Sequence, residues 1–155
     1  MRGPIELTLV MVKPDAMQRR LLGTIIRRLE RKGLVMVAGD LRQLSRDTAA
    51  SHYATHQGKD FYQRLLKFIT SGPVFVSVWR GPQAIQRVRT LVGATSPDEA
   101  HPGTIRGDFA LHITQNLVHA SDSLTSAGRE IALFFPDEDF FDITAVDADL
   151  LSPPE

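Results

Sequence analysis

The chain has 155 residues, of which 43% are hydrophobic and 23% charged, proportions that are usual for a globular protein with one domain. Lysine plus arginine and aspartate plus glutamate both total 18, so the overall charge does not favour nucleic acid or an anionic membrane as a partner. The absence of cysteine excludes disulfide bonds and thiolate catalysis. No apolar stretch is long enough to span a bilayer, and the first residues do not resemble a signal peptide, so we expect a soluble, cytoplasmic protein.

Charge is unevenly distributed along the chain. The last basic residue is Arg129, and every charged residue after it is acidic, from Glu130 to Glu155. We therefore expect a single domain over 1–155 that ends in an acidic tail of about 136–155. The body before the tail is left with a positive balance, which suits an anionic substrate but is equally explained by a solvated surface.

Hydrophobic periodicity predicts the elements up to residue 91. Runs of apolar and β-branched residues predict strands, the first of them stopped by Pro14, over 6–13, 34–44 and 73–79. Apolar residues that recur every three or four positions predict helices over 21–32, 45–56, 61–69 and 82–91. Gly33 is expected just beyond the first of these helices, and Pro82 in the first turn of the last.

The stretch from Gly93 to Gly107 has no regular pattern and is rich in residues that form turns. Loops of this length are uncommon in compact domains and usually carry function. A fourth strand is expected over 109–113 or 117–119, followed by a helix with Ser121 or Asp122 as its N-cap. The element order βαβ(αα)βαβα predicts an α+β sandwich, a sheet covered by helices.

Two familiar kinds of site are not supported by the sequence. There is no GxxxxGK[ST] and no GxGxxG after a strand, so the common phosphate-binding loops are missing. His52 and His56 stand four residues apart on a predicted helix, a spacing that can hold a metal ion. Because no third ligand is evident, we interpret these two histidines as a surface pair.

His119 is the strongest candidate for chemistry. It precedes a predicted helix N-terminus, where backbone N–H groups favour a bound phosphate. Lys13, Arg89 and Arg106 would complete a polyphosphate clamp if the fold brought them together, because guanidinium groups match phosphate oxygens. A neutral imidazole could then hold a phosphoryl group covalently. Taken one by one, these side chains are also explained as ordinary surface or core residues.

Four motifs together resemble the nucleoside diphosphate kinase family. They are Lys13-Pro14-Asp15, Ser71-Gly72-Pro73, the run HPGTIRGDF from His101 to Phe109, and Asn116-x-x-His119-x-Ser121-Asp122. Their order and spacing agree with the family over nearly the whole chain. The resemblance implies a ferredoxin-like α/β sandwich, with an antiparallel sheet covered by helices, added helices and a long active-site loop. It also implies ping-pong transfer of the γ-phosphate from a nucleoside triphosphate to a nucleoside diphosphate, with broad base specificity.

The resemblance also implies roles for individual residues. His119 would be the phosphorylated nucleophile, oriented by Ser121 and Glu130. The implied catalytic set is His119, Lys13, Asn116, Ser121, Glu130 and Tyr53. The implied nucleotide-binding set, in which Phe61 stacks on the base, is Lys13, Phe61, Arg89, Thr95, Arg106 and Asn116. Magnesium is expected as the metal–nucleotide complex, held mainly by phosphate oxygens and by no side chain directly.

The sequence departs from the family pattern at two positions near the motifs. Ala120 follows the nucleophile and Ala16 follows Lys-Pro-Asp, where the family usually has glycine. If position 120 needs a positive φ, alanine would add about 1 kcal/mol or more of strain. Family members are homo-oligomers, and we expect a hexamer rather than a tetramer, although the acidic tail differs from the usual C-terminal segment of the family.

Two other functions were weighed against the kinase. A ferredoxin-like module that binds nucleic acid or a protein is disfavoured, because the aromatic and basic pattern of an RNA-recognition domain is not visible. A protein-histidine phosphocarrier or kinase stays open as a secondary activity. It would differ from a nucleotide kinase in whether the phosphoryl group leaves readily to a nucleoside diphosphate.

Overall fold

A four-stranded antiparallel sheet forms the centre of the fold in the computed structural model, which describes residues 3–136, 140–141 and 143. The strands follow the order β2-β3-β1-β4 across the sheet. Their bounds are β1 (Ile5–Val12), β2 (Val35–Arg42), β3 (Val74–Pro82) and β4 (Val118–Ala120). Because β1 pairs with both β3 and β4, the residue that follows β1, Lys13, lies beside the start of β4.

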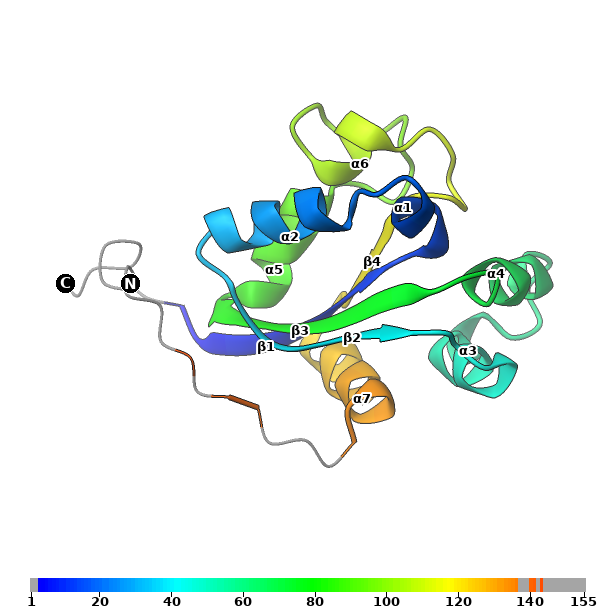
Figure 1. Ribbon diagram of the computed structural model, residues 1–155, viewed down its shortest axis with the longest axis horizontal. Coiled ribbons are helices and arrows are strands. Elements are labelled where there is room, and N and C mark those ends of the chain that lie inside the picture. The colour runs from blue at the N-terminus through cyan, green and yellow to red at the C-terminus, as the bar shows by residue number, and fades with distance from the viewer. Residues whose placement is uncertain (1–2, 137–139, 142, 144–155) are drawn as a thin grey trace.

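Helices cover both faces of this sheet (Figure 1). One face carries α2 (Leu22–Arg31) and α5 (Ala84–Val92), and the other carries α3 (Arg46–His52), α4 (Tyr62–Ile69) and α7 (Leu124–Phe134). Three short helices lie in the connections: α1 (Pro14–Gln18), the 3₁₀ turn η1 (Ala54–His56) and α6 (Ile105–Phe109). The ferredoxin-like α/β sandwich is thus confirmed, and the added helices cover the second face of its sheet.

The central strand β1 is buried on both faces of the sheet, which explains the continuous apolar run in its sequence. Val10 and Val12 pack into the core beneath α2 and α5, whereas Leu9 and Met11 pack into the core beneath α7. All four side chains are at most 1% exposed. Since successive side chains of a strand point to opposite faces, a stretch buried on both faces is apolar at consecutive positions, as residues 9–12 are.

The structure corrects two local predictions and decides between two alternatives left open for the fourth strand. Pro82 is the last residue of β3, so the helix expected over 82–91 begins at Ala84, after Gln83 with a positive φ of 51°. Of the two alternatives for the fourth strand, 117–119 agrees with β4, whereas Phe109 closes α6.

The N-cap of the last helix was also misplaced. Ser123, rather than Ser121 or Asp122, caps α7, and its hydroxyl accepts a hydrogen bond from the backbone of Ser126 at 3.1 Å. Ser121 is thereby left for another contact in the interior.

The C-terminal region is described only in part. The acidic tail expected over about 136–155 lies, apart from residues 136, 140–141 and 143, outside the described residues. Among the helices of the described part, none combines the length and the apolar character that crossing a membrane requires.

Candidate active site

A cleft of about 530 Å³ opens beside β4. Eight of the ten residues predicted for the site line it: Lys13, Tyr53, Phe61, Arg89, Thr95, Arg106, Asn116 and His119. The other two, Ser121 and Glu130, lie in the interior behind His119. The fold thus brings together residues that follow β1 and α3, precede α4, or lie in α5, the long loop, α6 and β4, which periodicity alone could not predict.

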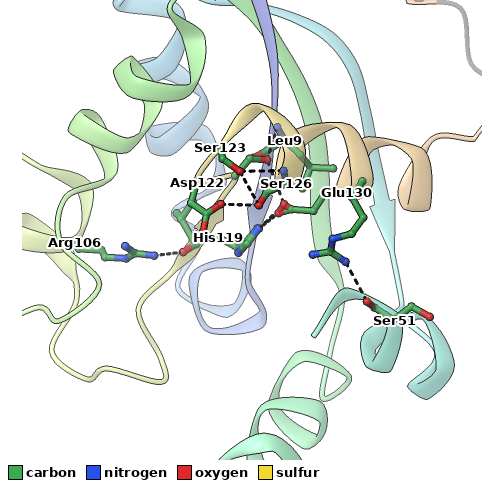
Figure 2. Close-up of polar contacts among 11 residues, drawn as sticks. Leu9, Ser51, Arg106, His119, Asp122, Ser123, Ser126 and Glu130 are labelled. Carbon is green, nitrogen blue, oxygen red and sulfur yellow. Dashed lines mark hydrogen bonds and ion pairs between the residues drawn. The ribbon is translucent and has the colours of Figure 1, made fainter. Parts of the chain in front are cut away.

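His119 is held from behind by a buried carboxylate. Its Nε2 contacts both oxygens of Glu130, Oε1 in a short hydrogen bond and Oε2 at 3.2 Å (Figure 2). Glu130 is 1% exposed, and the hydroxyl of Ser121 donates to its Oε2 at 3.3 Å. The amide of Leu9 in turn donates to that hydroxyl at 3.1 Å, which ties the whole chain of contacts to β1. The imidazole is therefore fixed in orientation.

This arrangement selects the tautomer of His119. An ionised carboxylate can only accept hydrogen bonds, so Nε2 carries the proton that it donates to Glu130. In a neutral imidazole the lone pair then lies on Nδ1. The side chain is 26% exposed and lines the cleft, so Nδ1 is available to a reactant there.

The backbone just before His119 is strained. Leu117 has a φ of 76°, and the N–H of Val118 donates to the carbonyl of Asn116 at 2.9 Å, which closes a three-residue γ-turn. A leucine in this region is held there only when its surroundings require it, because such strain is on the order of 1–3 kcal/mol. Here the amide of Leu117 donates to Asp15 and its carbonyl accepts from the amide of Lys13, at 3.1 and 2.8 Å. Asp15 therefore helps to hold the backbone conformation of Leu117 just before β4, a role that the sequence did not suggest.

Arg106 joins the long loop to β4. It is 8% exposed, and its guanidinium donates to the carbonyls of Asn116, Gly93 and Val118 at 3.2, 3.1 and 2.5 Å. Figure 2 draws one of these three contacts. Burial, with the nearby charge of Arg89, lowers its pKa to about 10, so it stays cationic at neutral pH. Three of its five donors are used in these contacts, which leaves two for a ligand in the cleft.

Lys13 contributes a second buried cation. Its Nζ donates to Asn116 Oδ1 at 2.8 Å and reaches the carbonyl of Thr114 at 3.4 Å. Burial, reinforced by the charge of Arg106, lowers the pKa of Lys13 to about 8, while Asp15 opposes the shift. The amide of Asn116 also donates to the carbonyl of Thr95 at 3.0 Å, so the lysine is positioned through the long loop.

The far end of the cleft is aromatic. Phe61 is 38% exposed, and His56 packs against it with ring centroids 5.5 Å apart. Tyr53 lies deeper, and burial together with the charge of Glu130 raises the pKa of its phenol above the usual range, so it stays protonated. Sequence reasoning missed His56 and Arg64 as cleft residues. Arg64 stands three residues after Phe61 on the same helix, a spacing that could have identified it.

His52 was wrongly interpreted as half of a surface pair with His56. It is the last residue of α3 and is 3% exposed, whereas His56 lies in the separate turn η1. Its ring meets that of His119 edge to face, with the centroids 4.5 Å apart. Burial is the main reason that the pKa of His52 lies well below its usual value, so the ring is neutral.

The backbone of Ala120 does not have the positive φ that would have strained an alanine at this position. This residue pairs with Val10 in the sheet, and Leu117 is the residue of the neighbourhood that has a positive φ. Alanine therefore brings no left-handed strain to position 120. Its methyl group is 8% exposed and belongs to the core beneath α5.

Comparison with known proteins identifies this arrangement. The family profile described as "Nucleoside diphosphate kinase" matches residues 6–140. The chain belongs to the nucleoside diphosphate kinase family. It is 59% identical over 133 residues to the nucleoside diphosphate kinase of Mycobacterium avium, an alignment that covers 85% of this chain and 98% of the relative. With the kinase of Archaeoglobus fulgidus it shares 54% identity over 145 residues, which cover 94% of this chain and 96% of the relative.

Solved structures agree with this assignment. The halophilic nucleoside diphosphate kinase from Halobacterium salinarum, in complex with CDP, superposes with a TM-score of 0.92 at 47% identity, covering 96% of this chain and 99% of that one. A family protein from Babesia bovis gives a TM-score of 0.90 at 44% identity, covering 94% and 99%. The chain is thus a nucleotide-binding phosphotransferase that passes the γ-phosphate of a nucleoside triphosphate to a nucleoside diphosphate, as its motifs predicted.

Proposed function

We propose that His119 carries the phosphoryl group in this transfer. Nδ1 attacks the γ-phosphorus, a P–N bond forms, and the bond to the bridging oxygen breaks, so the nucleoside diphosphate leaves. A second nucleoside diphosphate then attacks the phosphohistidine with its terminal phosphate oxygen and regenerates the imidazole. The observation that supports this proposal is the contact of Nε2 with the buried Glu130, which leaves Nδ1 on the cleft. The carboxylate also stabilises the positive charge that develops on the ring.

The cationic residues of the cleft would hold the phosphates. Arg106 has two donors left, Lys13 is already desolvated, and Arg89 and Thr95 line the same wall. Phosphoryl transfer depends mainly on positioning and on neutralising the oxygens of the transferred group, which such cations do. Because hydrogen bonds hold the side chains of Arg106 and Lys13 before a ligand binds, these two groups need little reorganisation at the reaction step.

Phe61 would stack on the base at the mouth of the cleft, with His56 beside it. Every base offers a face for stacking, so a site of this kind discriminates weakly and accepts several nucleotides. Lys13 and Asn116 would contact the sugar hydroxyls and the phosphates from the opposite side.

Magnesium is expected to enter as part of the nucleotide. Within the described residues, Asp122 is the one carboxylate that lines the cleft, which is too few oxygen ligands for a protein-held Mg²⁺. A hydrogen bond from Ser126 to this carboxyl lowers its pKa, so Asp122 is ionised and can approach the metal–nucleotide complex through water. The ion neutralises phosphate charge when bound.

The assembly and location of the chain are further parts of the proposal. Several large apolar side chains of the described surface are exposed, among them Leu111 at 95% and Leu124 at 67%, which supports a homo-oligomer. The preference for a hexamer over a tetramer rests on the family resemblance alone. We place the protein in the cytoplasm, where nucleoside di- and triphosphates are interconverted.

Labelling with γ-³²P-ATP and Mg²⁺ tests the proposed carrier. We expect an acid-labile, base-stable phosphoprotein whose label moves to added nucleoside diphosphate, and no label on His119→Ala. His112→Ala is the matched control, because His112 is exposed and does not line the cleft. Normal turnover by His119→Ala would overturn the mechanism. Label that forms but stays on the protein would indicate a phosphocarrier instead.

A further inference from the structure

His52 is a buried histidine that phosphoryl transfer does not use. Neither Nδ1 nor Nε2 has a hydrogen-bond partner, although the side chain is 3% exposed. A buried ring nitrogen normally has a partner, because burying it without one is unfavourable. The ring lies at the end of α3 and faces His119 of β4 and Phe134 of α7. An unpaired imidazole is therefore held beside the imidazole that reacts.

Glu130 completes a set of three metal-binding groups. One ligand atom from each of His52, His119 and Glu130 can be chosen so that all three lie within 4.8 Å of one another. A tetrahedral zinc ion with bonds of about 2.0–2.1 Å requires ligand atoms about 3.3 Å apart. The pair formed by His119 Nε2 and Glu130 Oε2 already stands at 3.2 Å. His52 can move closer without breaking a hydrogen bond of its ring, and the ion replaces the hydrogen bond between His119 and Glu130.

We propose that His52, His119 and Glu130 form a binding site for Zn²⁺ or a similar transition-metal ion, and that the bound ion inhibits phosphoryl transfer. Two imidazoles and one carboxylate are a ligand set typical of zinc, with a fourth position left for water from the cleft. Both ring nitrogens of His52 lack a hydrogen-bond partner, so either can bind an ion without losing a contact. The carboxylate of Glu130 offsets the charge of the ion at this buried position.

The ligand set separates this ion from the magnesium that accompanies the nucleotide. Mg²⁺ prefers six oxygen ligands and gives up its water reluctantly, so two imidazole nitrogens bind it poorly. Zn²⁺, Co²⁺ and Ni²⁺ prefer such nitrogens. The site therefore responds to trace transition metals in the presence of a large excess of magnesium.

The expected inhibition follows from the tautomer of His119 and rests on the proposed function. A neutral imidazole has one lone pair, which in the free protein lies on Nδ1 because Nε2 carries the proton. A metal ion on Nε2 binds the other neutral tautomer, so the ring proton leaves Nε2 and one proton is taken up from water at Nδ1. The nitrogen that faces the cleft then has no lone pair with which to attack phosphorus.

Metal binding is measured first, without nucleotide, on the metal-free full chain. Isothermal titration with Zn²⁺ alone should give one site per chain, and His52→Asn should weaken it at least tenfold. His101→Asn, which removes an exposed histidine, should leave the affinity within twofold. Equal zinc affinity in His52→Asn and the wild type would overturn the site, as would the absence of a stoichiometric site in the wild type.

A second measurement needs no variant, in case His52→Asn fails to fold. Long-range ¹H–¹⁵N spectra of the wild-type imidazoles should show Zn²⁺ on Nε2 of His119, with the proton on Nδ1, and a ligating nitrogen on His52. Unchanged resonances of these two rings at saturating zinc would refute the proposal.

Inhibition is measured last, by phosphorylation with Mg–ATP at fixed free Zn²⁺. The wild type should lose its rate as the site fills, and His52→Asn should need at least tenfold more zinc. No phosphorylation in the absence of zinc would refute the proposed function and leave the binding result standing. Normal phosphorylation of a zinc-saturated protein would refute the inhibition alone.

Discussion

Replacing Lys13 by methionine should abolish transfer and yet stabilise the fold. The Nζ of Lys13 is buried beside Arg106, and burial is the main reason that its pKa falls from 10.5 to about 8. At about 1.4 kcal/mol per pKa unit, keeping this lysine charged in the folded state costs about 3 kcal/mol. Methionine has a similar shape and no charge, so it removes that cost. It also removes the donor to Asn116 Oδ1 and leaves a buried oxygen unpaired, at about 1–3 kcal/mol. We expect a net gain of about 0–2 kcal/mol in the free energy of unfolding at pH 7.

The pH dependence of this gain identifies its cause. Below pH 8 Lys13 is protonated in both states of the wild type, so the full cost is present. Between pH 8 and 10.5 the folded state releases the proton first, and the unfolded state binds more protons. The free energy of unfolding of the wild type therefore rises between pH 8 and 10.5 because of Lys13. The variant lacks this group and shows no such rise. The advantage of Lys13→Met should shrink from pH 8 upward, vanish before about pH 9.5, and become a deficit of about 1–3 kcal/mol near pH 10.5, where only the unpaired oxygen of Asn116 still separates the two proteins.

Urea unfolding of both proteins between pH 6 and 10.5, at one protein concentration, measures the effect. Lys32→Met is the control, because Lys32 is exposed at the end of α2 and its replacement should alter neither stability nor its pH dependence appreciably. A loss of stability in Lys13→Met at pH 7, or an advantage that does not change up to pH 10.5, would refute the reasoning. Either result would show that burying the charge of Lys13 does not lower the stability of the folded protein.

Two further replacements test the groups that hold His119 and the loop. Glu130→Gln keeps the size of the side chain but loses the charge that accepts from Nε2, so rapid-quench phosphorylation should slow about tenfold to hundredfold with the fold retained. An unchanged rate would show that the charge is not needed. Arg106→Lys keeps the charge, but one ammonium cannot reach the carbonyls of Asn116, Gly93 and Val118 together. We expect a loss of about 2–4 kcal/mol in unfolding experiments and at least a hundredfold loss of transfer; full activity would remove Arg106 from the phosphate clamp.

The sequence predicted most elements because each buries a periodic apolar face. The resemblance to a known family, carried by four motifs, also named eight residues that the structure places around the cleft, and their roles stay predictions. The errors of sequence reasoning occurred where tertiary contacts decide the outcome. Leu117 adopts a positive φ only because Asp15 and Lys13 bond its backbone, and no propensity of leucine reveals this. His52 and His56 looked like one helical pair because the end of α3 at His52 could not be seen in the pattern.

The sequence and the structure lead to different expectations for Ala120, a position at which the family usually has glycine. From the sequence, Ala120 was expected to be strained if the position needed a positive φ. In the structure it lies in β4 opposite Val10 and has no such φ. The two views predict opposite signs for Ala120→Gly. If alanine were strained, glycine would stabilise the protein by about 1 kcal/mol. Since Ala120 is an ordinary strand residue packed beneath α5, glycine should destabilise it by about 0.5–1 kcal/mol, through lost packing and a more flexible unfolded chain.

Transfer should stay within twofold of the wild type in Ala120→Gly, because Glu130 and Ser121, rather than position 120, fix the orientation of His119. Thermal unfolding together with the phosphorylation rate measures both quantities on one sample. A more stable and faster glycine variant would contradict the structure at this position and restore the expectation of strain. A less stable variant with an unchanged rate would mean that alanine at this position belongs to the core of the fold and leaves the chemistry of the adjacent histidine intact.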